Sequence, residues 1–256
     1  MVGKNRAEKR GLPGLSLWAL LARSSFYKVL AVALLMAAAE VPLFYRTLRG
    51  DGIAGFEIKI EESHIHLVFL AALGAVYFLL IRMNRVLDNE GRYTMMRLQV
   101  SQGSIFWIRT AYDVLCLLML FAVQAGLVLC FAESYRRTPG MPQGSQTVFL
   151  AFYRNDFLHG VLPMADLGKW VRGGLMLLAM GMDEAGGMGK RYRTTQVSVF
   201  LMSAAWFAVP AGVTWQDTVC CFVYVVVIGA DLLDLYRSCR SRERMEVCMG
   251  NMGNQT

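Results

Sequence analysis

The stretch Ala111–Glu133, which reads AYDVLCLLMLFAVQAGLVLCFAE, decides the fold class of this chain. A helix that crosses a bilayer needs about 20 mostly apolar residues, and this stretch is long enough and apolar enough to form one. Five more stretches of the same kind occur along the chain. The six predicted spans are Tyr27–Tyr45, His66–Met83, Ala111–Glu133, Trp170–Met182, Gln196–Val213 and Trp215–Tyr236.

The composition agrees with a polytopic membrane protein. Of the 256 residues, 55% are hydrophobic and 18% are charged, whereas about a quarter of the residues of a soluble domain are charged. Six spans use about half of the chain. The longest remaining stretch, Glu133–Lys169, is too short for an independent core. These proportions exclude a separate soluble catalytic domain.

The positions of the basic residues predict the orientation in the membrane. Of the 26 Lys and Arg residues, 18 lie before or at the start of the first span, in or at the edge of the second gap, in the fourth gap, or after the last span. Basic residues stay on the cytoplasmic side, so both termini are predicted to be cytoplasmic. Basic residues on both sides of the last two spans place those ends in the cytoplasm, which requires an even number of crossings before them. This requirement supports the weak fourth span, whose start contains Lys169 and Arg172. We expect the net charge of +7 to attract the lipid bilayer of a bacterial plasma membrane, and not nucleic acid.

The predicted fold is therefore all-α, with six transmembrane helices preceded by an amphipathic interfacial helix. Residues 1–25 form a cytoplasmic tail and this helix, and Trp18 beside a basic flank favours an interfacial position. The alternative is that the helix extends the first span. Residues 26–236 form the membrane domain, with a cytoplasmic link at 84–110 and an aromatic outer loop at 134–168. Residues 237–256 form a second cytoplasmic tail.

Two polar residues inside the spans are candidates for a transport pathway. Ionisable residues within the bilayer are costly and often functional, and Glu40 lies deep in the first span, two residues before Pro42. Gln124 lies in the middle of the third span, where such a side chain more often bonds a neighbouring helix. We predict Glu40 and Gln124 as pathway residues.

The other acidic residues of the spans have simpler interpretations. Asp113 follows Arg109 by one turn, which favours a local ion pair. Asp231 and Asp234 precede Arg237 at the inner end of the last span, where pairing or snorkelling to the interface suffices.

No motif of a metal, nucleotide or nucleophile site is present in the sequence. The chain has three histidines and no H-E-x-x-H pattern. Glu61 and Glu62 precede His64 and His66, which leaves an intramembrane hydrolase as a minor alternative. The glycine-rich stretch 186–191 lacks the first glycine and the Ser or Thr of a phosphate loop. We expect no cofactor and no ATP hydrolysis by this chain itself, which is not predicted to be an enzyme.

The cytoplasmic link contains a short amphipathic segment over residues 92–104, where Ser101 or Ser104 can cap the third span. The run Arg97-Leu98-Gln99-Val100-Ser101, followed by Phe106, resembles the link of ABC-2-type permeases, in which a Leu-Pro-Val-Ser segment and an aromatic residue lead into the third of six helices. Gln99 stands where proline is common in that family.

The resemblance implies a transmembrane exporter subunit that pairs as a homodimer or a heterodimer. A separate ATP-binding subunit would hydrolyse the ATP, and Arg97, Leu98, Val100 and Ser101 would form the contact that couples the two. We predict this function, with an unknown substrate. The alternative is a non-transporting membrane protein, such as a sensor or an assembly factor.

Overall fold

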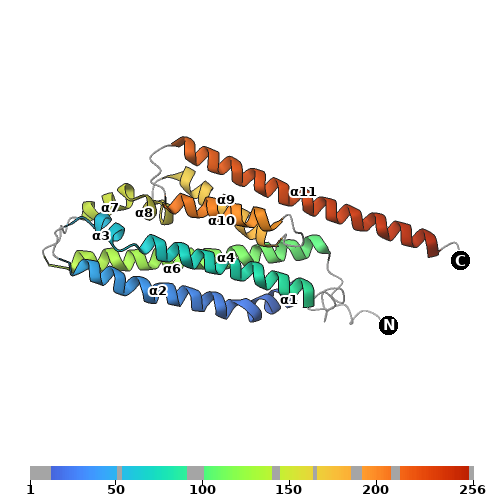
Figure 1. Cartoon of the computed structure of the whole chain (residues 1–256), viewed down its shortest axis with the longest axis horizontal. Coiled ribbons are helices and arrows are strands. Elements are labelled where there is room, and N and C mark those ends of the chain that lie inside the picture. Colours follow the sequence, from blue (N-terminus) through green and yellow to red (C-terminus); the bar gives the residue numbers. More distant parts are fainter. Residues whose placement is uncertain are drawn as a thin grey trace, which may run out of the picture.

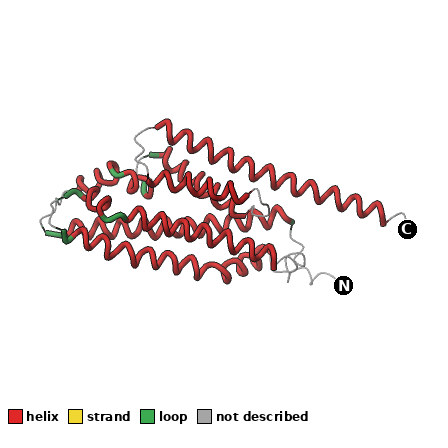
Figure 2. The backbone as a smooth tube through the Cα atoms, viewed as in Figure 1, coloured by secondary structure: helices red, strands yellow, loops and turns green. Residues whose placement is uncertain are grey.

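The structure, a computed structural model, describes residues 13–50, 54–90, 101–139, 145–163, 166–185, 192–208 and 214–253. All regular secondary structure in these ranges is helical, and they contain no strand. The long helices lie side by side along one axis (Figure 1 and Figure 2). The prediction of an all-α protein is therefore confirmed.

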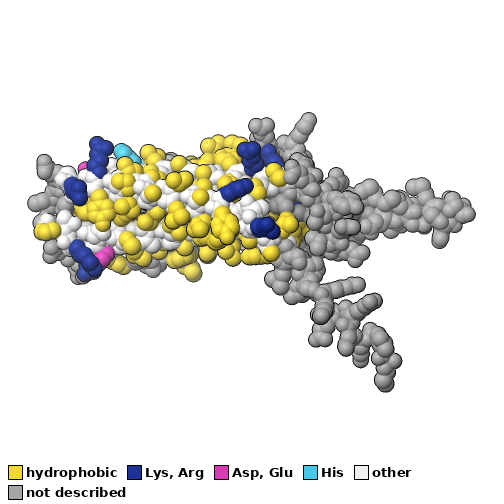
Figure 3. All heavy atoms as spheres, turned by 90° about the horizontal axis from the view of Figure 1, so that it is seen from below, with side chains coloured by type: hydrophobic (Ala, Val, Ile, Leu, Met, Phe, Trp, Pro, Cys, Tyr) yellow, Lys and Arg dark blue, Asp and Glu magenta, His cyan; other side chains and the backbone are white. Residues whose placement is uncertain are grey.

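Four helices are long and apolar enough to cross a membrane, and they correspond to the first, second, third and sixth predicted spans. These helices are α2 (Tyr27–Leu48), α4 (Ile65–Glu90), α6 (Gln102–Arg137) and α11 (Thr214–Gly253). Figure 3 shows apolar side chains over the middle of one face, with Lys and Arg gathered toward both ends. Such a band suits a hydrocarbon core between two polar interfaces. The chain is an integral membrane protein.

The predicted fourth and fifth spans form the helices α9 (Leu167–Ala185) and α10 (Tyr192–Ala208). Neither helix reaches the length and hydropathy of the other four within its described residues. In α9 the reason is charge, because both of its ends carry ionisable side chains. In α10 the apolar part extends only over Gln196–Ala205. Six crossings and cytoplasmic termini stay predictions.

The N-terminal helix α1 (Pro13–Leu21) continues into α2 through a π-helical segment, Ala22–Phe26. It packs against α6, where the Trp18 and Tyr112 rings meet edge to face with centroids 5.8 Å apart. The Ser25 hydroxyl lies 2.8 Å from the Tyr112 hydroxyl. The helix thus extends the first span, which was the alternative to an interfacial helix. Its position relative to the membrane surface stays a prediction.

Three short helices cap the bundle at the end opposite the termini (Figure 1). They are α3 (Phe56–Glu62), α7 (Ser145–Arg154) and α8 (Asp156–Val161). Helices α7 and α8 both lie within the predicted outer loop, residues 134–168. Phe152 packs beside Phe56 in the core of the cap, while Phe149 and Tyr153 are exposed. The exposed rings agree with the predicted aromatic surface, since such rings favour a membrane interface.

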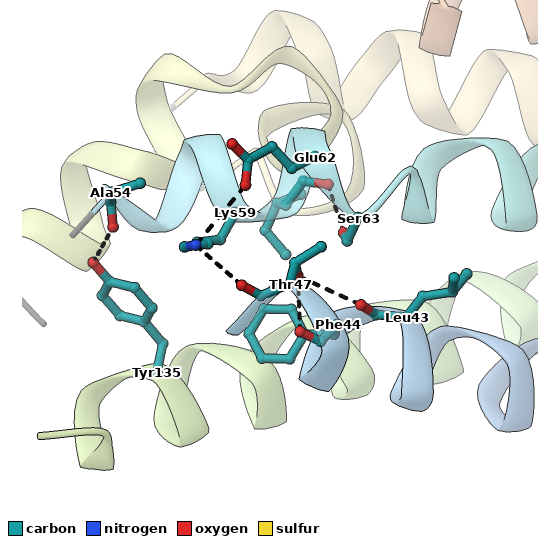
Figure 4. Close-up of polar contacts among 9 residues, drawn as sticks. Leu43, Phe44, Thr47, Ala54, Lys59, Glu62, Ser63 and Tyr135 are labelled. Atoms are coloured by element: carbon teal, nitrogen blue, oxygen red, sulfur yellow. Dashed lines mark hydrogen bonds and ion pairs between the residues drawn. The ribbon is translucent and has the colours of Figure 1, made fainter. Parts of the chain in front are cut away.

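Lys59 joins the cap to the end of α2 (Figure 4). Its ammonium group donates to the Thr47 carbonyl oxygen at 3.0 Å and lies 3.9 Å from the Glu62 carboxylate. A cation is favourable there, because the last carbonyl groups of a helix carry partial negative charge. The Tyr135 hydroxyl makes a second link, donating to the Ala54 carbonyl oxygen at 2.8 Å.

Replacing Lys59 with alanine is expected to lower the free energy of unfolding by about 1–3 kcal/mol, because it leaves the Thr47 carbonyl without its charged donor. Thermal unfolding in detergent micelles measures the change. Ile58→Ala in the same helix is the control, since the Ile58 side chain is 45% exposed. Equal melting temperatures for the Lys59 variant and the wild type would contradict a structural role for the ammonium group.

The last two turns of α9 lie in the centre of the bundle. Helix α9 packs against α4, α6, α10 and α11, and every residue from 179 to 185 is buried. A helix end that is enclosed on all sides is normally apolar. In α9, this enclosed end carries the carboxyl groups of Asp183 and Glu184, which belong to the candidate site.

Candidate functional site

Four carboxyl side chains from three helices are buried inside the bundle and interact electrostatically. Asp183 and Glu184 of α9 are 0% and 1% exposed, Asp113 of α6 is 1% exposed, and Asp231 of α11 is 5% exposed. Glu184 interacts electrostatically with Asp113 and Asp183, and Asp231 interacts with Asp183. We call these four residues the acidic cluster.

Tyr77 and Gln196 hold one side of the acidic cluster. The Tyr77 hydroxyl, from α4, donates to Oδ2 of Asp183 at 2.7 Å and also lies 3.1 Å from the backbone oxygen of Gln196. The Gln196 side-chain amide, from α10, donates to the backbone oxygen of Asp183 at 3.4 Å. Asp183 is therefore oriented by two neighbouring helices.

Asn84 contacts the other side of the acidic cluster. Its amide, from α4, donates to Oδ2 of Asp113 at 2.8 Å and to the backbone oxygen of Glu184 at 3.4 Å. Arg109 lies one turn before Asp113 on α6, is 3% exposed, and attracts the Asp113 carboxylate. Arg109 and Asp113 thus attract each other, but both are buried and Asp113 also accepts a hydrogen bond from Asn84; a direct ion pair between them stays a prediction.

Several carboxylate oxygens of the acidic cluster have no hydrogen-bond partner among the described residues. Both side-chain oxygens of Glu184 are in this state, as are Oδ1 of Asp183 and Oδ2 of Asp231. An ionised carboxylate without donors or a counter-charge is costly to bury, and neighbouring like charges increase that cost. The arrangement can therefore accept protons or a cationic group. No set of three or more potential metal ligands comes together in the described part of the chain.

The two predicted pathway residues lie next to each other. The Gln124 amide of α6 donates to Oε2 of Glu40 in α2 at 3.1 Å, and both side chains are 0% exposed. The other carboxylate oxygen of Glu40 and the amide oxygen of Gln124 have no partner among the described residues. Gln124 follows Asp113 by about 16 Å along α6, so the pair is separate from the acidic cluster. It joins two helices, and its role in a pathway stays a prediction.

Removing one member of this pair should cost more than removing both. Gln124→Leu leaves the Glu40 carboxyl group buried without its donor, which we expect to lower the free energy of unfolding by about 1–3 kcal/mol. The double variant Glu40→Leu and Gln124→Leu should regain most of this loss, since it leaves no polar atom unpaired. Thermal unfolding of the two single variants and the double variant measures the coupling. Additive changes would contradict a direct interaction.

Of the predicted coupling residues, Arg97, Leu98 and Val100 lie outside the described residues. Ser101 is described and precedes the first residue of α6. Its side-chain oxygen accepts a hydrogen bond from the Ser104 backbone N–H at 3.2 Å, as expected of an N-cap residue. The prediction that a serine caps the third span is confirmed.

The sequence interpretation missed most of the acidic cluster. Asp234 pairs with Arg237 at 3.7 Å as predicted, but Asp231 turns into the bundle. Asp183 and Glu184 were not considered as candidates. The available signal was two adjacent carboxyl residues at the end of an apolar helix that has no basic residue in its last turn.

The residues that suggested an intramembrane hydrolase lie at the cap end of the bundle, away from the acidic cluster. Glu61, Glu62 and His64 are exposed, and Glu62 pairs with Lys59. His64 has a positive φ of 53° in the turn between α3 and α4, and its ring lies 6.0 Å from that of His66. Histidine adopts this left-handed backbone more often than most residues, so the turn by itself does not indicate catalysis.

No protein-family model matches the chain, and no curated protein or solved structure matches it either.

Proposed function

We propose that this protein is the transmembrane permease subunit of a transporter and that its pathway for a cationic cargo passes the acidic cluster. Glu184 carries the proposal, because it is 1% exposed and neither of its carboxylate oxygens has a partner among the described residues. Ionisable residues buried within membrane helices commonly mark ion and substrate pathways.

A purely structural role explains the acidic cluster less well. Buried polar groups that only hold helices together normally satisfy each other's hydrogen bonds, as the Tyr77 hydroxyl and Oδ2 of Asp183 do. Glu184 instead sits beside two further carboxyl groups, Asp113 and Asp183. A passing cation or an organic ammonium group would supply the missing positive charge, whereas an anionic cargo would be repelled.

We propose further that a separate ATP-binding subunit drives the transport. The resemblance of residues 97–101 to the link of ABC-2-type permeases supports this, and Ser101 connects that link to the site. Ser101 caps the helix that carries Asp113, and the two residues are about 18 Å apart along its axis. A push on the link would therefore tilt the helix that forms one wall of the acidic cluster. The same resemblance supports a dimer of membrane subunits in a bacterial plasma membrane.

Efflux from cells of the native host tests the cargo class. Cells that overproduce the chain and are preloaded with radiolabelled tetraphenylphosphonium should release it faster than cells from which the chain is deleted. Carboxyfluorescein, an anion, should leave both kinds of cell at the same rate. Equal release of the cation from both kinds of cell would contradict the proposal. Faster release of both probes would show that the acidic cluster does not select by charge.

Affinity purification from the native host tests the partner. We expect an ATPase to copurify with the wild-type chain and to be lost on Leu98→Asp. Ile58→Asp is the control, because it makes a similar apolar-to-acidic exchange at an exposed residue of the cap. Retention of the ATPase by the Leu98 variant would contradict the coupling role. Copurification of a different protein, with no ATPase, would favour the sensor or assembly factor.

A further inference from the structure

A cavity of about 330 Å³ lies between α4 and α10, next to the acidic cluster but outside it. Pockets that hold small ligands in proteins are typically about 300–1,000 Å³. The lining residues are Phe78, Ile81, Arg82, Arg85, Gln196 and Val197. Most of the lining surface is apolar; three of the six lining residues are apolar, and the other three carry two guanidinium groups and an amide.

The two arginines lie on one face of α4. Arg82 and Arg85 are three residues apart, so their side chains emerge as neighbours along the helix. Both are exposed. Arg85 donates to the amide oxygen of Gln196 at 2.9 Å, a neutral acceptor that does not neutralise its charge. Arginine pairs bind phosphate well, because each guanidinium offers two parallel N–H donors.

The apolar half of the cavity continues the same face. Phe78 precedes Arg82 by one helical turn and is 46% exposed, while Val197 of α10 is 41% exposed. Phe78 lies in the candidate membrane span Ile65–Val86, and Val197 lies in the apolar part of α10, Gln196–Ala205. The arginines stand near the end of the apolar stretch Ile65–Val86, where a lipid headgroup meets the acyl chains. A ligand for this cavity needs an anionic group joined directly to an apolar chain.

We propose that this cavity binds an anionic phospholipid, with its phosphate on Arg82 and Arg85 and the start of an acyl chain against Phe78 and Val197. Basic pockets between membrane helices on the cytoplasmic side commonly bind such headgroups. The proposal does not depend on the transport function. A free phosphate shares the charge of the headgroup, but it would leave the apolar half of the cavity uncovered.

The bound phosphate also reaches the acidic cluster through Gln196. A phosphate competes with the Gln196 amide oxygen for Arg85. Gln196 in turn contacts Asp183, and its backbone oxygen lies 3.1 Å from the Tyr77 hydroxyl. Lipid binding therefore changes the hydrogen bonds of Gln196, which holds Asp183 in place. Through Gln196 the bilayer can alter the acidic cluster.

Native mass spectrometry of the detergent-purified full chain tests the proposal. The wild type should retain phosphatidylglycerol about tenfold better than phosphatidylcholine, and Arg82→Gln with Arg85→Gln should remove this preference. The matched control is Arg136→Gln with Arg137→Gln, which removes the same charge from exposed residues at the opposite end of the bundle. Loss of the preference in the control as well would show that net charge alone binds the lipid, and would overturn the proposal.

Two further measurements cover the remaining outcomes. Val197→Trp fills the apolar half of the cavity without changing charge, so it should also weaken phosphatidylglycerol retention, even if the double arginine variant fails to fold. Unchanged retention in the tryptophan variant would overturn the proposal. Inorganic phosphate at millimolar concentration should not displace the lipid. If it displaces phosphatidylglycerol fully, the cavity is a site for free phosphate and the lipid assignment is wrong.

Discussion

The Glu184→Gln variant is expected to unfold at a higher temperature than the wild type while losing cation efflux. The two effects have the same cause, which is the carboxyl group beside Asp113 and Asp183. A neutral amide removes the repulsion among these groups, and its N–H groups can donate to the two remaining carboxylates. We expect the free energy of unfolding to rise by about 1–3 kcal/mol, the usual desolvation penalty of a buried unpaired polar group.

A gain in stability together with a loss of function is typical of a residue that the fold retains for its activity. Thermal unfolding in detergent measures the first effect, and release of tetraphenylphosphonium from preloaded cells measures the second. Glu133→Gln is the control, since Glu133 is an exposed residue of α6 that pairs with Arg136 and Arg137. Exposed ion pairs contribute little, so the control should change neither measurement.

Two outcomes would contradict this view of the acidic cluster. If Glu184→Gln lowers the melting temperature, the carboxylate makes a stabilising interaction that the described contacts do not explain. If efflux continues at the wild-type rate, the pathway does not pass Glu184, whatever the change in stability.

The Gly181→Ala variant is expected to lose about 1–3 kcal/mol of unfolding free energy, the usual cost of overpacking a core. A methyl group at Gly181 of α9 would lie 2.5 Å from Cγ2 of Val114 in α6. It would also lie 3.3 Å from two backbone atoms of α6, the Thr110 oxygen and the Val114 nitrogen. Val114 is β-branched and held by its own helix, so it has little freedom to move aside. The two helices must therefore separate, and they carry Asp113 and Glu184 apart.

Two variants make this test specific. Gly174→Ala lies on the same helix with nothing within 4 Å of the added methyl group, so the better helix propensity of alanine should leave stability equal or slightly higher. Val114→Ala combined with Gly181→Ala removes the worst contact and should recover part of the loss. Equal melting temperatures for the Gly174 and Gly181 variants would contradict a close approach of α6 and α9.

The long apolar helices were predictable because their signal is local. The stretch Ala111–Glu133 predicts a helix on its own, and it forms most of α6. Ser101 was predictable as an N-cap for the same reason, since its partner Ser104 lies three residues away. The start of α2 was harder, because the continuity of α1 and α2 depends on packing of Trp18 and Ser25 against Tyr112 of a distant helix.

The candidate site was only partly predictable. Glu40 and Gln124 were identified separately as polar residues within spans, but nothing in the sequence paired them across 84 positions. Asp231 was interpreted as a residue of the inner interface, because sequence spacing does not show on which side of a helix the neighbours lie. Asp183 and Glu184 follow the predicted fourth span, whose weakness was attributed to Lys169 and Arg172 at its start, and only the packing of four other helices shows that this end is enclosed.

The sequence by itself determined that this protein is all-helical and belongs in a membrane, because the length and apolar character of each helix are properties of contiguous residues. Only the tertiary structure brought Asp113, Asp183, Glu184 and Asp231 together, since each side chain is enclosed by helices that are remote in sequence. A charged residue in an apolar stretch indicates that its burial would cost free energy. Whether other side chains compensate for that cost depends on how the helices pack.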